Sequence, residues 1–75
     1  MFIKVTNAAK DFLHTPLYIK AEAILTVYEG TSLRNEGTAD EYKEDVTFIF
    51  CPTHGTWEVL DRAEDVYKQL AQLGL

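Results

Sequence analysis

The segment between residues 46 and 60 constrains the fold more than any other part of the chain. A strand pattern over 46–51 and a return strand over 56–60 flank a Pro-Thr-His-Gly turn, which predicts a β-hairpin. Large apolar side chains occupy both faces of the first strand: Val46, Phe48 and Phe50 on one, Ile49 and Cys51 on the other. A single amphipathic helix can cover only one face of a sheet, so the other must curl into a small barrel or bury against another chain. The hairpin therefore predicts a strongly curled sheet, a homodimer, or both.

The length of the chain, 75 residues, predicts one domain over 1–75. A core of this size contributes only about 3–5 kcal/mol of stability. Cys51 is the only cysteine, so no disulfide within the chain can add to it, and oligomerisation is the expected extra source. Neither a signal-peptide pattern nor an apolar run long enough for a membrane helix occurs, so we expect a cytoplasmic protein that does not enter a membrane.

The charge balance narrows the class of partner. Twelve acidic and seven basic side chains give a formal net charge of −5. Nucleic-acid binding depends on lysine and arginine contacts to phosphate, so this balance disfavours direct nucleic-acid binding, and it disfavours anionic lipid for the same reason. The charge is compatible with a basic protein partner; solubility is the alternative explanation.

The first half of the chain contains two further strand patterns. Residues 2–6 are rich in β-formers and predict a short strand, and a second extended stretch starts at Pro16. The apolar alternation breaks where Ile24 and Leu25 stand side by side, which predicts a bulge or tight bend at 21–23. A short helix over 21–27 is the competing interpretation, because alanine and glutamate favour helix.

A polar, acidic segment separates the strand that ends at Tyr28 from the hairpin. Residues 30–45 are rich in Gly, Ser, Asn and Asp, which is typical of a mobile loop. Sixteen structureless residues are many for so small a domain. We therefore expect either a binding role for the loop or an extension of its two flanking strands as a long hairpin.

The C-terminal segment has the clearest periodicity. Asp61 is a predicted N-cap, and Glu64 three residues later completes a capping-box pattern. Five side chains fall on one face at helical spacing: Ala63, Val66, Tyr67, Leu70 and Leu73. Gly74 suits a helix-terminating position. The sequence thus predicts an α+β fold, a small antiparallel β-meander or curled sheet packed by one C-terminal α-helix.

The acidic segment also contains the candidate binding residues. Tyr42 is an aromatic side chain among carboxylates, and aromatic side chains are enriched at interface hot spots. Glu41, Glu44 and Asp45 flank it and could contact a basic protein surface. We predict these four residues as the partner contacts; a solvated loop without a partner is the alternative.

A Cys-x-x-His pair, Cys51 and His54, is the one pattern that could support chemistry. A structural zinc site needs four ligands, and a cysteine nucleophile needs an orienting group and an oxyanion hole. Neither set is evident, so we expect no catalytic residues, no metal and no cofactor. A small metal-binding or cysteine-dependent enzyme is the alternative.

Three stretches resemble the small FlbD-like flagellar proteins, of which similar examples are encoded in phages and prophages. They are Leu17-Tyr18-Ile19-Lys20-Ala21-Glu22-Ala23-Ile24, Val46-Thr47-Phe48-Ile49-Phe50, and the run from Trp57 to Val66 that enters the helix. The resemblance implies a β-meander plus helix that acts as a regulatory or binding protein. The predicted function is a non-enzymatic protein-interaction or regulatory module of phage or prophage type; a structural subunit of a homo-oligomeric assembly is the alternative.

Overall fold

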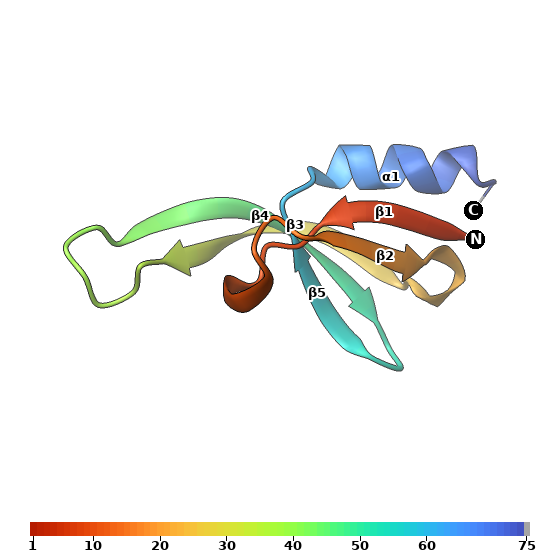
Figure 1. The fold of residues 1–75 in the computed structure, drawn as a ribbon. Helices are drawn as coiled ribbons and strands as arrows, with labels where there is room; N and C mark the ends of the chain where they lie inside the picture. Colours follow the sequence, from red (N-terminus) through yellow and green to blue (C-terminus); the bar gives the residue numbers. More distant parts are fainter. Residues whose placement is uncertain (75) are drawn as a thin grey trace.

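The computed structural model describes residues 1–74 and has two antiparallel sheets with one C-terminal helix (Figure 1). The elements follow in the order β1 (Phe2–Thr6), η1 (Lys10–Phe12), β2 (Pro16–Lys20), η2 (Ala21–Ala23), β3 (Thr26–Arg34), β4 (Tyr42–Cys51), β5 (Gly55–Val59) and α1 (Ala63–Gln72), where η marks a 3-10 turn. The predicted α+β class and the predicted hairpin over 46–60 are confirmed.

The strands divide into a β1-β2 hairpin and a β3-β4-β5 meander. The division falls at η2, the bend that the broken alternation predicts; the competing helix over 21–27 is wrong, because Thr26 and Val27 already belong to β3. An isolated bridge between Asn7 and Val59 joins the two sheets at one corner. From this junction the two sheets diverge with their inner faces toward each other (Figure 1).

The hydrophobic core lies between the two sheets and α1. Its fully buried members alternate along the strands, because every second side chain of a strand points to the same face. They are Ile3 and Val5 of β1, Ile19 of β2, Ile49 and Cys51 of β4, Val59 of β5 and Val66 of α1, together with Ala21. Leu17, Ile24, Val27, Trp57, Leu70 and Leu73 pack against this cluster from its margin.

The outward face of the meander is also apolar, as the hairpin pattern predicts. Phe48 and Phe50 of β4 point away from the core and are half-buried. Tyr28 of β3 stacks on Phe48, with ring centroids 5.3 Å apart and an interplanar angle of 26°. Stacking between neighbouring strands therefore shelters part of this face within a single copy of the chain.

The acidic segment forms a projecting β-ribbon. β3 and β4 pair continuously from Thr26–Phe50 to Arg34–Tyr42, so the connecting turn covers only 35–41. The prediction of a sixteen-residue mobile loop over 30–45 is wrong. The alternative prediction, in which the two flanking strands extend as a long hairpin, is confirmed. We call residues 30–46 the arm. It projects from the rest of the molecule (Figure 1). The whole molecule, arm included, measures 45 × 22 × 19 Å along its principal axes.

Two details of the predicted helix are wrong. Asp61 does not cap α1: the N-cap is Arg62, without a side-chain cap, and the Asp61 carboxylate accepts the N–H of Thr6 instead. An unpaired strand-edge N–H within reach competes for the same carboxylate. Tyr67 is 70% exposed although it lies on the predicted apolar stripe, because α1 buries only the narrow line through Val66. The predicted terminator is confirmed, since Gly74 has a φ of 79°.

The side chain of Gln69 substitutes for a neighbouring strand at the free edge of β1. The Lys4 N–H donates to Gln69 Oε1 at 3.1 Å, and Gln69 Nε2 donates to the Lys4 carbonyl at 2.8 Å. The side-chain amide presents an N–H donor next to a carbonyl acceptor, so one side chain pairs with both backbone groups of Lys4. This contact anchors α1 to β1.

We expect Gln69→Ala to lower the free energy of unfolding by about 1–2 kcal/mol, because two hydrogen bonds of about 0.5–1.5 kcal/mol each are lost. The direction is opposite to helix propensity, in which alanine is the better residue. Urea unfolding measures the change. Gln72→Ala, at an exposed position of the same helix, is the matched control; equal effects of the two substitutions would contradict the role of Gln69.

Candidate interaction site

The tip of the arm is a tightly hydrogen-bonded turn. Asn35 and Gly37 adopt positive φ angles of 52° and 81°, which asparagine and glycine tolerate best. The Gly37 N–H donates to Glu41 Oε2 at 2.9 Å, and the Thr38 hydroxyl donates to the Asn35 carbonyl at 2.7 Å. Glu41 therefore closes the turn with one carboxylate oxygen, and the arm presents its carboxylates on an ordered support.

One face of the arm contains an ion pair. Arg34 Nε donates to Glu44 Oε1 at 2.8 Å, and the Arg34 side chain is only 11% exposed. A cation buried to this degree needs a counter-charge, which Glu44 supplies. The terminal Nη2 of Arg34 has no hydrogen-bond partner within the described residues. The Glu44 carboxylate thus neutralises Arg34 within the arm.

The four predicted contact residues do not form one surface. Tyr42 lies directly opposite Arg34 and shares a face with Glu44, while Asp45 lies opposite Thr31 on the other face. Glu41 belongs to the tip. The strand period of two separates them, because Glu44 and Asp45 are consecutive residues of β4. The outermost carboxylates are instead Glu36 and Asp40 in the turn, both of them exposed and unpaired within residues 1–74.

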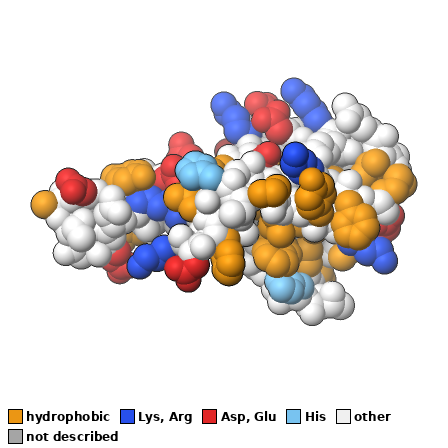
Figure 2. Space-filling view, viewed as in Figure 1, with side chains coloured by type: hydrophobic (Ala, Val, Ile, Leu, Met, Phe, Trp, Pro, Cys, Tyr) orange, Lys and Arg blue, Asp and Glu red, His pale blue; other side chains and the backbone are white. Residues whose placement is uncertain are grey.

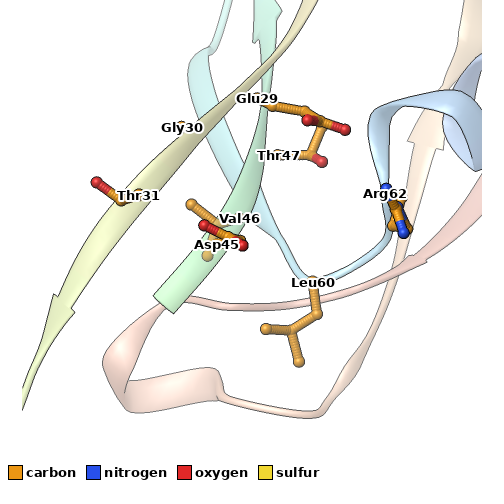
Figure 3. Close-up of a pocket in the computed structure, with 8 residues that line it drawn as sticks. All are labelled: Glu29, Gly30, Thr31, Asp45, Val46, Thr47, Leu60 and Arg62. Atoms are coloured by element: carbon orange, nitrogen blue, oxygen red, sulfur yellow. The ribbon is translucent and has the colours of Figure 1, made fainter. Parts of the chain in front are cut away.

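A hollow of about 460 Å³ lies where the arm joins the body (Figure 3). Its polar lining comes from Glu29 and Thr31 of β3, Asp45 and Thr47 of β4, and Arg62, with Leu60 as an apolar wall. Arg62 is exposed, and its Nε lies 3.7 Å from Glu64 Oε1. The lining combines two carboxylates with the Arg62 guanidinium, which suits a polar side chain of a partner. Asp45 thus contributes to this basal hollow rather than to the tip.

Cys51 and His54 are not brought together for chemistry. The Cys51 side chain belongs to the core cluster, and burial raises the pKa of its thiol. The His54 ring stacks on Trp57, with centroids 4.1 Å apart and an interplanar angle of 6°. The backbone N–H of His54 donates to the Cys51 carbonyl at 2.9 Å, which accounts for their spacing as a hairpin turn. Residues 1–74 hold no group of three or more His, Cys, Asp or Glu side chains arranged for a metal ion.

The helical content of residues 1–74 includes no segment with the length and apolarity needed to cross a membrane. Comparisons of the chain with protein-family models, with curated proteins and with solved structures gave no match. The resemblance to FlbD-like proteins therefore stays a prediction.

Proposed function

We propose that the protein is a non-enzymatic interaction module whose arm binds a basic protein surface. The observation that supports this is the arm itself: an ordered, acidic β-ribbon that projects from the body and contributes only Val46 to the buried apolar side chains. A domain with so small a core gains little stability from such a ribbon. A hydrogen-bonded tip and an internal ion pair keep the ribbon in one shape, which lowers the entropy cost of binding.

The charges of the arm support a cationic partner. Five carboxylates, Glu36, Asp40, Glu41, Glu44 and Asp45, stand against two cations, Arg34 and Lys43. Because Arg34 is buried against Glu44, the exposed part of the arm is dominated by the remaining carboxylates. Complementary charge raises the association rate and selects against acidic partners. Nucleic acid and anionic lipid are correspondingly disfavoured as ligands of this surface. The predicted cytoplasmic location and phage or prophage origin stay predictions.

We expect Glu36→Gln/Asp40→Asn/Asp45→Asn to weaken binding of a fluorescein-labelled lysine-rich peptide by about tenfold or more, since three exposed charges at about 0.5 kcal/mol each give about 1.5 kcal/mol. These residues make no hydrogen bond through their carboxylates within residues 1–74, so the fold should persist. Fluorescence anisotropy at low and high salt measures the affinity, and salt should reduce the difference.

The matched control is Asp11→Asn/Glu58→Gln/Glu64→Gln, which changes the net charge by the same amount outside the arm. Its affinity for the peptide should stay close to that of the parent. Equal weakening by both triple variants would show that the peptide senses net charge alone and would overturn the arm as the binding element.

The second candidate, a structural subunit of a homo-oligomeric assembly, is favoured by the number of large side chains left at the surface. Phe2, Phe12, Tyr18, Leu25, Tyr28 and Tyr67 are all at least 47% exposed. Leaving a large apolar side chain in water forgoes about 1.5–3 kcal/mol relative to burying it. The two candidates are compatible, because a module that binds a protein partner can take a second copy of itself.

A further inference from the structure

The outward surface of the β1-β2 hairpin combines two aromatic rings with two lysines. Phe2 and Tyr18 are 63% and 60% exposed, whereas Ile3 and Ile19 on the opposite side are buried. Phe2 lies directly opposite Lys20, and Lys4 directly opposite Tyr18, so the four side chains form a two-by-two block. We call these four residues the outer face. It is an amphipathic, cationic surface on an otherwise acidic molecule.

The outer face and the tip of the arm lie at opposite ends of the molecule. The N-terminus lies at one end of the 45 Å axis with β1 and β2 in the same half of the molecule, and the turn over 35–41 lies at the other end (Figure 1). In the same view, hydrophobic side chains gather over the half that holds β1 and β2, and acidic side chains occur along the arm (Figure 2). In the sequence, residues 1–20 contain three of the seven basic residues and only one acidic residue.

We propose that the basic partner of the arm is a second copy of this chain, and that two copies exchange arms across their outer faces. This inference rests on the proposed function, because it names the partner of the same arm. The arm of each copy lies on the outer face of the other, with Glu36 and Asp40 against Lys4 and Lys20. Tyr42, which is 51% exposed, supplies apolar contact to Phe2 and Tyr18.

The shape of the molecule favours a closed pair. Two elongated copies that lie antiparallel place each acidic end beside the other's cationic end, and a twofold axis makes both contacts equivalent. The contact between an arm and an outer face is then formed twice in each dimer, so two weak contacts together stabilise the pair. The complementary charges also select the antiparallel arrangement, because a parallel pair would place two acidic tips together.

The test uses charge reversal on each surface separately and then on both. The face variant is Lys4→Glu/Lys20→Glu, the arm variant is Glu36→Lys/Asp40→Lys, and the combined variant contains all four substitutions. The combined variant has the parental net charge of −5, so it controls for general electrostatics. Sedimentation velocity over a concentration series measures the mass, which is 8.5 kDa for one chain.

We expect a dimer for the parent at low salt, at least a tenfold weaker dimer for the face variant and for the arm variant, and recovery of the parental dimer in the combined variant. High salt should dissociate the parental dimer. The Lys4 contact to Gln69 uses backbone atoms, so the face variant should keep the fold. Circular dichroism checks this, and Lys4→Gln/Lys20→Gln replaces the face variant if it unfolds.

Three results would overturn the inference in distinguishable ways. A parent that stays monomeric yet binds the lysine-rich peptide through its arm would remove the second copy and leave the proposed function intact. A parent that does neither would remove both. A dimer that persists in all reversal variants would place the interface elsewhere, such as the Tyr28–Phe48 face, and would refute arm exchange.

Discussion

Replacing Ile49 by alanine should lower the free energy of unfolding by about 2–5 kcal/mol, the cost of deleting a buried aliphatic side chain without full collapse of the cavity. Ile49 is 0% exposed and lies near the C-terminal end of β4, the central strand of the meander. Its side chain belongs to the cluster through which β1, β2, β5 and α1 meet. Because a core of this size contributes only about 3–5 kcal/mol in total, we expect a largely unfolded protein at room temperature.

Two controls test the cause of this loss. Ile49→Val removes one methylene and should cost about 0.5–1.5 kcal/mol, within reach of urea unfolding. Leu25→Ala removes an equally large side chain that is 67% exposed, and should change stability by less than about 0.5 kcal/mol. Similar losses for Ile49→Ala and Leu25→Ala would contradict the assignment of the core to the space between the sheets.

Gly30→Ala should destabilise the protein by about 1–3 kcal/mol, the usual cost of overpacking. The sign is informative, because alanine in a strand is ordinarily favoured over glycine by about 0.5–1 kcal/mol. A Cβ at Gly30 would stand 2.6 Å from Cε2 of Phe48, whose ring lies across the β3 backbone at this point. The ring would have to move away and give up its stacking on Tyr28.

A double variant isolates that clash. Phe48→Leu alone removes the ring contact, and in this background Gly30→Ala should be neutral or stabilising. The coupling energy from the four-member cycle should therefore be about 1 kcal/mol or more. Thermal unfolding of the four proteins provides it. Additive effects would show that Gly30 does not depend on Phe48.

The local patterns predicted most of the elements. β1, the β4-β5 hairpin and α1 follow from β-formers, turn residues and helical spacing, which are local properties of the chain. The aromatic side chains on the outward face of the meander were also predictable, because the period of two places Phe48 and Phe50 on the face of β4 that is opposite to the face of Ile49. The division into two sheets was not, since it depends on η2 and on which strand edges meet in space.

The arm was harder to predict for a physical reason. Its strands are polar on both faces and have no core to pack against, so they lack the apolar alternation by which strands are recognised. They are held by pairing with each other and by the Arg34–Glu44 contact across the ribbon. Once the pairing is known, the separation of Glu44 from Asp45 follows from the strand period alone. The outer face could have been found in the same way, from the charged and aromatic residues that alternate with Ile3 and Ile19.

Asp61 shows where a local rule fails. A carboxylate before a helix is a good cap in isolation, but the open edge of β1 offers a competing N–H from fifty-five positions earlier in the chain. No pattern within a short window contains that information.

The amide of Gln69 has a consequence for how this protein would fail under stress. While α1 is attached, the N–H and the carbonyl of Lys4 are both hydrogen-bonded to Gln69 and cannot pair with another strand. Detachment of the helix would uncover that edge together with the apolar underside of β1, which is the combination that seeds cross-β fibrils. The attachment of α1, through the Gln69 amide and the buried Val66, therefore keeps this edge from pairing with another chain.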